Sequence, residues 1–379
     1  MSRIPNVRIS FVAALALALI ATVVALTDGS APSAGAVGAS ASAGGGASLC
    51  YGEVVVAQEN ADAVAVIDQF SNLVTTTIGV QPQPSLTAFS GDGRLLFVRS
   101  YTNQSIRVID TATNTTVRTL TFTDSPGQMI TNRDGSALWV DLYDGSNHSL
   151  VKLNAVTGAT LATYSLMNYA NQLFLSPNES VVWATVYTFS TVDVFELDAN
   201  TLNAMSTTST GSSAFASTMS ADGSRIYLAD YSGTGIVSFN TSTHAVSTIG
   251  TVSQPRDVAV SPSGTTLYVF AGSNVSNYRL YAIDVATGQA TQGMVLAPLA
   301  NGAVAVNLRI TTDGSKLYVT FANYANGGIG VFSTSNLTTG VFLPMEVYVP
   351  VAVCPLTADP APATTTTTTP DPVVPTFTA

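Results

Sequence analysis

Regularly spaced tyrosines are the side chains of this sequence best suited to contact a ligand. In four places an aromatic residue is followed four positions later by a tyrosine, which gives Tyr101, Tyr143, Tyr187 and Tyr231. Aromatic rings stack on sugars and on apolar ligands, so tyrosines at equivalent positions of a repeat are candidate ligand-binding residues. The same rings can instead fill the space between adjacent sheets, and we expect packing to be their main role.

Residue types that support catalysis or metal binding are sparse. His148 and His244 are the only histidines and belong to different repeat units, which argues against a His-rich metal site or a His-based triad. The loop from Asp141 to Asn147 lacks the alternating oxygen ligands and the terminal Glu of an EF-hand. Turns such as Asp92-Gly93 lack the lysine and the following helix of a phosphate-binding loop. We therefore predict no catalytic residue, no metal ligand and no cofactor.

Two landmarks repeat along the chain and define the elements that carry these residues. One is a turn before an aromatic strand, found six times, at residues 90–98, 132–140, 176–184, 220–228, 261–269 and 311–319. The other is a short apolar strand closed by a small polar residue, found seven times, ending at Asp68, Asp110, Asn154, Asp198, Asn240, Asp284 and Ser333. The second landmark recurs after 42, 44, 44, 42, 44 and 49 residues, a period typical of four-stranded propeller blades.

The polar residues that close the short strands are predicted to cap turns. Paired-carboxylate catalysis needs two carboxyl groups that face one substrate. Here each residue ends a strand, where a short polar side chain can accept hydrogen bonds from backbone N–H groups two residues later. Repetition in every unit is typical of a structural cap rather than of a single active site.

The repeats predict an all-β chain, folded as a seven-bladed β-propeller of four-stranded antiparallel blades. In the unit that contains Asp110, for example, strands are expected near 84–90, 95–101, 105–110 and 116–122. The candidate tyrosines would then lie where the second strand of a blade meets its loop to the third, on the face that carries the mouth of the channel.

The segments TLTFTDSPGQMITNRDGSALWV and SIRVIDTATNTTV resemble the YVTN-type repeats of bacterial seven-bladed propellers, and the similarity covers about residues 50–354. The resemblance implies the fold, whereas proteins with such blades have diverse roles. Propellers similar to this one include lactonases and quinone- or metal-dependent oxidoreductases. The histidines and metal ligands expected of such enzymes are missing from this sequence.

The ends of the repeat region predict how the ring closes. The first unit begins at a second strand, residues 50–58, so its first strand must come from the C-terminal segment 346–354. This arrangement places Cys50 and Cys354 on the two flanks of an absent hairpin turn. Adjacent antiparallel strands meet the distance that a disulfide requires, and we predict a Cys50–Cys354 bridge in place of the turn.

Composition indicates four segments and an extracellular location. Residues 1–26 are predicted to be a signal peptide or an N-terminal anchor, 27–48 a flexible spacer, 49–355 the propeller, and 356–379 a disordered tail rich in Thr and Pro. A formal charge of −10 with only two lysines argues against nucleic acid and anionic lipid as partners. We expect a monomer at the cell surface or outside the cell, which contacts a membrane only if the N-terminal segment is retained.

These observations favour a non-catalytic binding scaffold that uses loops on one face to hold a protein, a glycan or a small ligand. The alternative is a propeller enzyme, a lactonase-like hydrolase or an oxidoreductase, with its site at the mouth of the channel. A structural envelope protein presented on the Thr-rich stalk is a third possibility. Carboxylates from at least three blades that converge on the mouth would favour the enzyme, and a lining of Thr, Ser and apolar groups would favour the scaffold.

Overall fold

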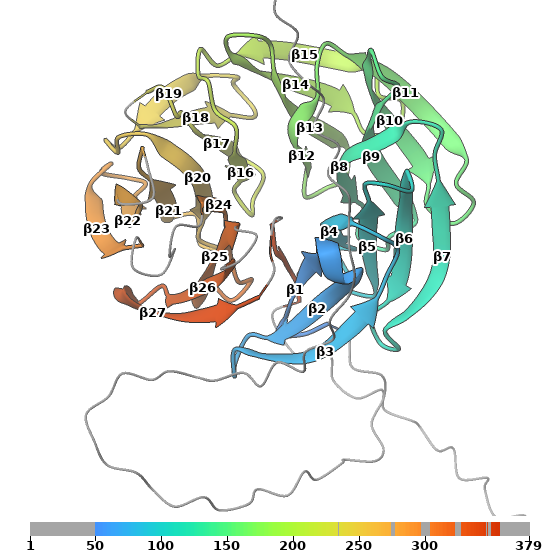
Figure 1. The fold of residues 1–379 in the computed structure, drawn as a ribbon. Coiled ribbons are helices and arrows are strands. Elements are labelled where there is room, and N and C mark those ends of the chain that lie inside the picture. The colour runs from blue at the N-terminus through green and yellow to red at the C-terminus, as the bar shows by residue number, and fades with distance from the viewer. Residues whose placement is uncertain are drawn as a thin grey trace, which may run out of the picture. The chain divides into compact units, whose positions relative to one another are not determined.

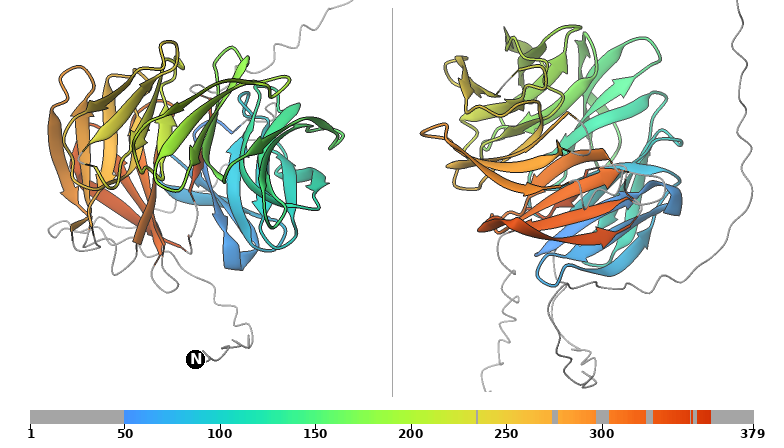
Figure 2. Two further views of the ribbon diagram at one scale, coloured as in Figure 1. Left: turned by 90° about the horizontal axis from the view of Figure 1, so that it is seen from above. Right: turned by 60° about the vertical axis from the view of Figure 1, so that its left-hand side comes forward.

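The repeats fold into seven sheets arranged in a ring around a central channel, as a computed structural model of the chain shows (Figure 1). The structure describes residues 50–233, 235–273, 277–296, 304–322, 327–345, 347 and 350–356. Each sheet has four antiparallel strands, with the first strand of the blade beside the channel and the fourth at the outer edge (Figures 1 and 2). The prediction of an all-β, seven-bladed propeller is confirmed.

The first blade joins the two ends of the repeat region. Its strands, from the channel outward, are β28 (Ala352–Val353), β1 (Glu53–Gln58), β2 (Ala63–Asp68) and β3 (Leu73–Gly79). A single 3₁₀ turn, η1 (Glu59–Ala61), connects β1 to β2.

The remaining blades follow in chain order, each with its first strand at the channel. The second blade consists of β4 (Pro84–Phe89), β5 (Leu95–Ser100), β6 (Ser105–Asp110) and β7 (Thr115–Thr121). The third consists of β8 (Ser125–Thr131), β9 (Ala137–Tyr143), β10 (His148–Asn154) and β11 (Thr160–Leu166). The fourth consists of β12 (Ala170–Leu175), β13 (Val181–Tyr187), β14 (Val192–Asp198) and β15 (Ala204–Ser209).

The last three blades repeat the same order. The fifth consists of β16 (Ser217–Met219), β17 (Arg225–Ala229), β18 (Ile236–Asn240) and β19 (Val246–Ile249). The sixth consists of β20 (Pro255–Val260), β21 (Thr266–Ala271), β22 (Arg279–Asp284) and β23 (Ala290–Val295). The seventh consists of β24 (Val304–Ile310), β25 (Lys316–Ala322), β26 (Gly328–Ser333) and β27 (Asn336–Pro344).

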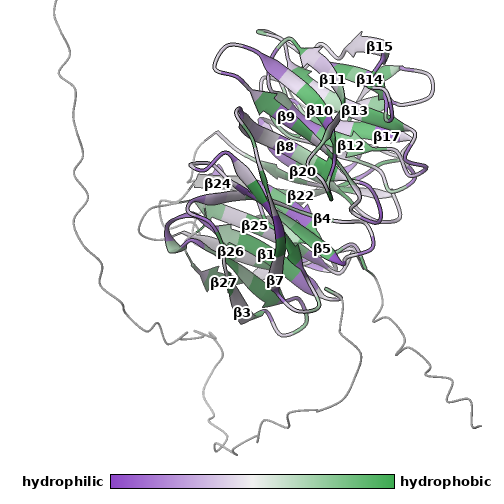
Figure 3. Ribbon diagram, turned by 90° about the vertical axis from the view of Figure 1, so that its right-hand side faces the viewer, coloured by the Kyte–Doolittle hydropathy of each residue, from purple (hydrophilic) through white to green (hydrophobic). Residues whose placement is uncertain are grey.

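The hydrophobic core lies between neighbouring blades. Because both faces of a blade pack against other blades, the second and third strands are nearly continuous apolar runs rather than alternating ones. Phe97 of β5, for example, is fully buried and packs in one cluster with Leu138 and Val140 of β9 in the next blade. In Figure 3 the hydrophobic colour accordingly follows the strands, and the loops at their ends are mostly hydrophilic.

The turns confirm the predicted caps. Asn154 Oδ1 accepts hydrogen bonds from the backbone N–H groups of Val156 and Thr157, both at 2.9 Å. Asp198 Oδ1 accepts the equivalent bonds from Asn200 at 2.9 Å and Thr201 at 2.8 Å. These polar residues are therefore committed to turn geometry at the outer ends of the blades, away from the channel.

Ring closure follows the predicted scheme with a shorter strand. The sulfur atoms of Cys50 and Cys354 are bonded, and their Cα atoms lie 5.7 Å apart. The C-terminal strand was expected to extend over 346–354, and among the residues of this segment that the structure describes, Ala352 and Val353 pair with β1. Beyond them a single hydrogen bond from the Cys354 N–H to the Glu53 carbonyl (2.9 Å) continues the contact. The disulfide therefore reinforces a short strand pairing, beside which the first and seventh blades share an apolar cluster that includes Ile67 and Tyr318.

A half-buried carboxyl group at this closure makes stability depend on pH. Glu53 lies opposite Asp68 in the β1–β2 pair. Burial, with the charge of Asp68 as the second cause, raises the pKa of Glu53 from 4.5 to about 7. The folded protein therefore binds this proton more tightly than the unfolded chain does. The stabilising contribution is fully present below pH 4.5 and is lost as the pH rises towards 7.

We expect Glu53→Gln to flatten the dependence of stability on pH. Between acidic and mildly alkaline pH, the free energy of unfolding of the variant should rise by about 1 kcal/mol relative to that of the wild type. This figure is reduced for solvent screening of a half-buried group. Thermal unfolding at a series of pH values measures the difference, with Glu59→Gln in the neighbouring turn as the control. If the unfolding temperatures of the wild type and of Glu53→Gln change with pH in parallel, the raised pKa of Glu53 is not the cause of the pH dependence.

The segments predicted at 1–26 and 27–48 lie outside the described residues, as does almost all of the tail at 356–379. Within the described part of the chain, no helix has the length and apolar character needed to cross a membrane. A disulfide is compatible with an extracellular protein.

Candidate functional site

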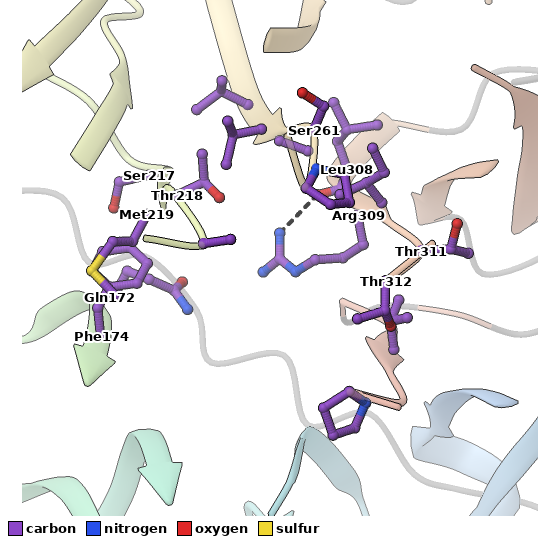
Figure 4. Close-up of a pocket in the computed structure, with 18 residues that line it drawn as sticks. Gln172, Phe174, Ser217, Thr218, Met219, Ser261, Leu308, Arg309, Thr311 and Thr312 are labelled. Atoms are coloured by element: carbon purple, nitrogen blue, oxygen red, sulfur yellow. Dashed lines mark hydrogen bonds between the residues drawn. The ribbon is translucent and has the colours of Figure 1, made fainter. Parts of the chain in front are cut away.

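The central channel contains two adjoining cavities. The lower cavity, of about 350 Å³, lies towards the turns between first and second strands and is lined by residues such as Ser261, Thr311 and Pro355. The upper cavity, of about 450 Å³, lies towards the other end of the channel, where the first strands of the blades begin. All seven blades line it with residues of their innermost strands or residues beside them. Gln172 and Arg309 border both cavities. In Figure 4 the Arg309 side chain extends from its strand into the space on the side of Gln172.

β-Bulges at the start of the innermost strands determine which side chains border the upper cavity. In the sixth blade Pro255 pairs with Ala271, and Asp257 pairs with Phe270, so Arg256 is an extra residue without a partner in β21. The same register shift makes Asn171 the extra residue of β12. A bulge turns its extra side chain away from the regular alternation of the strand.

The bulge recurs in the innermost strands of five blades. Register shifts between the first and second strands occur in the second, third, fourth, sixth and seventh blades. Gln128, Asn171 and Arg256, which lie at these shifts, all line the upper cavity. The bulges thus convert a structural repeat into a ring of positions whose side chains differ from blade to blade.

Arg256, one of the residues that line the cavity, carries a positively charged guanidinium group. Its Nε donates to the Gly272 carbonyl at 2.6 Å and its Nη2 to the Ser273 carbonyl at 3.1 Å. The guanidinium carbon lies 5.0 Å from the ring centre of Tyr231 and 5.2 Å from that of Tyr278, a cation–π arrangement on two sides. Among the ion pairs of the described residues, none joins Arg256 to a carboxylate.

Arg309 is the second arginine beside the cavity, and its charge is balanced by Asp257. Arg309 Nη1 lies 3.6 Å from Asp257 Oδ2 and donates to the Leu308 carbonyl at 2.8 Å. Asp257 is buried and also accepts the backbone N–H groups of Val258 and Leu308, each at 2.7 Å. Burial raises the pKa of Asp257, and Arg309 opposes that shift. The carboxylate holds Arg309 in place, and Asp257 is itself one of the residues that line the cavity.

The upper cavity is therefore lined by amides, hydroxyls, apolar groups and two guanidinium groups, with one buried carboxylate. No three carboxylates from different blades converge on it among its described lining residues. The described residues also contain no group of three or more His, Cys, Asp or Glu side chains that could hold a metal ion. This lining can bind an anion or a polar group, and it offers no carboxylate pair for acid and base catalysis.

The four predicted tyrosines lie on the face of the upper cavity, but they do not form an equivalent ring. The expectation that they mainly fill the space between blades is wrong for Tyr101 and Tyr143, which are 64% and 40% exposed. Tyr187 packs in part against the core between the fourth and fifth blades. Tyr231 is covered on one side by Arg256. The interior positions belong instead to the aromatic residues four positions earlier.

A carboxylate–histidine pair lies on the same face and was missed by sequence reasoning. His148 Nδ1 lies 3.0 Å from Asp141 Oδ1, and Asp141 Oδ2 accepts the Ala170 N–H of the next blade at 3.2 Å. Gly127 permits this approach, since a Cβ atom there would lie 2.9 Å from Asp141 Oδ2. The two residues are seven positions apart in sequence, yet they face each other because β9 and β10 form a hairpin.

Comparisons with known proteins agree with the fold. The profile of a family described as "Lactonase, 7-bladed beta-propeller" matches residues 172–307. The chain is a seven-bladed β-propeller. No curated protein matches the chain significantly. The family match covers the central blades, which is less than half of the chain. It therefore supports the fold alone.

Two solved structures illustrate the likeness of this propeller to others. A functionally unknown protein from Desulfotomaculum acetoxidans is 18% identical, with a TM-score of 0.64 over 80% of this chain and 98% of the other. Hydrazine synthase from Kuenenia stuttgartiensis is 17% identical, with a TM-score of 0.58 over 75% of this chain and 93% of the other. Identities this low show a shared fold alone.

Proposed function

We propose that this propeller is an exported, non-catalytic binding protein that holds a small organic anion in the upper cavity of its channel. The observation that carries the proposal is Arg256, a guanidinium at the cavity lining that no carboxylate neutralises among the described ion pairs. Its position is fixed by a bulge, two carbonyl groups and two aromatic rings.

The rest of the lining supports an anion that also carries hydroxyl groups. Gln128, Gln172 and Asn307 border the cavity with amide groups, which can donate to and accept from a hydroxyl. Arg309 adds guanidinium N–H groups, and its own charge is balanced by Asp257. A volume of about 450 Å³ lies in the range of small-molecule sites. Hydroxy acids combine a carboxylate with hydroxyl groups and therefore fit such a lining.

Calorimetric titration of the whole exported protein with succinate, citrate and gluconate tests the proposal. We expect at least one of these anions to bind, and Arg256→Gln to weaken that binding about 10- to 100-fold, since a hydrogen bond to a charged group contributes roughly 1.5–3 kcal/mol. Arg94→Gln is the matched control, because Arg94 is exposed and pairs with Asp92 at the opposite end of its blade. Binding of no anion, or equal losses in both variants, would refute the proposal.

A hydrolase is the second candidate, favoured by the Asp141–His148 pair and by the partial match to the lactonase family. A carboxylate that orients the imidazole of a histidine is an arrangement used for general-base catalysis. Turnover of simple lactones by the wild type, lost in His148→Gln at unchanged stability, would assign the protein to the enzymes. We expect no such turnover, because no second acid or oxyanion-binding group is brought to His148 by the described contacts.

A further inference from the structure

A band of aromatic side chains runs across the upper face of the third, fourth and fifth blades. Phe189, at the tip of the β13–β14 loop, is 80% exposed, and Phe215, in the β15–β16 connection, is 56% exposed. Tyr169, in the β11–β12 connection, is 39% exposed. All belong to loops at the same end of the strands. The aromatic surface is defined here as Tyr143, His148, Tyr169, Tyr187, Phe189 and Phe215.

Three rings of the aromatic surface, those of Tyr143, His148 and Tyr187, are held by contacts within their own loops and strands. The Tyr143 hydroxyl donates to the Gly145 carbonyl at 2.7 Å, and the Tyr187 hydroxyl donates to the Phe189 carbonyl at 3.2 Å. Tyr143 stacks on His148 with ring centres 4.6 Å apart. Because these contacts restrict Tyr143, His148 and Tyr187, little side-chain entropy remains to be lost when a ligand contacts these three rings.

The backbone of Phe189 adopts an uncommon conformation. Its backbone has φ of 64°, in the left-handed region that a bulky side chain rarely adopts. The strained conformation presents an aromatic ring to solvent, where it gains no packing energy. The same backbone region is found at structural turns such as that of Glu179, so the feature that distinguishes Phe189 is its exposed aromatic ring.

The remaining tyrosines of the repeat mark the limits of this surface. Tyr101 in the second blade has the Arg99 guanidinium 5.6 Å from its ring centre, and Tyr231 in the fifth has that of Arg256 at 5.0 Å. A cation over a ring blocks stacking on that side. In contrast, Tyr187 packs beside Phe215 at 5.7 Å, and Phe215 also borders the upper cavity. The aromatic surface therefore leads to the mouth of the channel.

The polar residues around the rings are short and carry oxygen atoms. Asp144 and Asn147 lie beside Tyr143 in one exposed loop, and Thr188 and Thr191 flank Phe189 in another. Such groups exchange hydrogen bonds with sugar hydroxyls. The chain has a net charge of −10 and only two lysines, so a polyanionic glycan would be repelled.

We propose that the aromatic surface binds a neutral oligosaccharide chain, whose pyranose rings stack on Tyr169, Phe189 and Phe215. Flat sugar faces carry C–H groups that fit an aromatic ring, and their equatorial hydroxyls reach the polar groups beside it. All three rings belong to loops that adjoin the fourth blade, which places them at the same part of the upper face. This site adjoins the channel site for an anion, because Phe215 borders the upper cavity as well, whereas Tyr169 and Phe189 do not line that cavity.

Affinity electrophoresis in gels that contain galactomannan, xyloglucan or mixed-linkage β-glucan tests the proposal, followed by titration with mannohexaose and cellohexaose. We expect retardation by at least one polysaccharide, and at least a tenfold loss of affinity in the double variant Tyr169→Ala, Phe189→Ala. Tyr101→Ala is the matched control, since it removes an exposed ring of the same face that an arginine covers. Thermal unfolding of all variants confirms that they are folded.

Three results would overturn the proposal. The first is the absence of retardation by every neutral polysaccharide. The second is an equal loss of affinity in the control and the double variant. The third is a wild-type protein that self-associates in sedimentation experiments through these rings, with the double variant monomeric, because the surface would then be a protein interface. Anion titrations of the double variant should match the wild type in either case, which separates this test from that of Arg256.

Discussion

Replacing both cysteines by serine should lower the unfolding temperature by several degrees, the largest effect expected at the ends of the chain. The Cys50–Cys354 bridge joins residues separated by 304 positions. In the chain-entropy model a loop of this length corresponds to about 6 kcal/mol, and residual structure in the unfolded chain usually reduces the figure to roughly 2–4 kcal/mol. The described strand pairing at this closure is short, with two residue pairs between β28 and β1, so the bridge is the main link of the C-terminal segment to the first blade beside the apolar cluster of the two blades.

Differential scanning calorimetry of the wild type and the double variant measures this loss. Wild type reduced under denaturing conditions and refolded in reductant provides the control, because it lacks the bridge and keeps both sulfur atoms. It should unfold at a temperature near that of the double variant. If oxidised wild type and the Cys50→Ser, Cys354→Ser variant unfold at the same temperature, the ring is closed by packing and the disulfide is dispensable.

The fold could be predicted because its determinants are local and repeated. A turn with Asp-Gly or a close substitute, an aromatic strand and a capped third strand recur along the chain, and each can be recognised without knowledge of its neighbours. Even the exception at Glu179 keeps the turn, with φ of 59° at a position that is glycine in equivalent turns such as that at Gly93. The disulfide followed from the count of strands, which is also a property of the whole repeat.

The candidate site could not be predicted in the same way, because it depends on register. Arg256 and Asn171 line the cavity because a bulge places each of them outside the regular pairing of its strand. A bulge is set by packing among the innermost strands and leaves no fixed residue signature. The available signal was compositional, since charged residues such as Arg256, Asp257 and Arg309 interrupt first strands that are otherwise apolar or weakly polar.

The orientation of the tyrosines was misjudged for a related reason. Residues four apart in a strand share a face, so Tyr101 and Tyr143 were expected to be covered like Phe97 and Trp139. β5 ends at Ser100, however, and β9 ends at Tyr143 itself. A ring at or beyond the end of a strand extends past the edge of the neighbouring sheet, and it therefore becomes exposed.

Asp257→Leu should destabilise the protein by about 3–5 kcal/mol, because the Asp257 carboxylate links two blades and balances a cation. It accepts the Leu308 N–H of β24 as well as the Val258 N–H of its own strand, and it lies 3.6 Å from Arg309. Leucine fills a similar volume and leaves both N–H groups and the Arg309 charge without their partner. Asp257→Asn keeps one carbonyl acceptor and should cost less, about 1–2 kcal/mol.

Chemical denaturation of the wild type, Asp257→Leu and Asp257→Asn measures the two losses, and the double variant Asp257→Leu, Arg309→Met identifies their origin. If an unpaired buried charge causes most of the loss, adding Arg309→Met to Asp257→Leu should restore about half of the stability, because replacing both members of a buried ion pair by apolar groups leaves no charge uncompensated. No recovery would attribute the loss to the backbone N–H groups. A wild-type value for Asp257→Leu would show that β20 and β24 are held together without this carboxylate, by the apolar contacts of Ala259 and Leu308 in their shared core cluster.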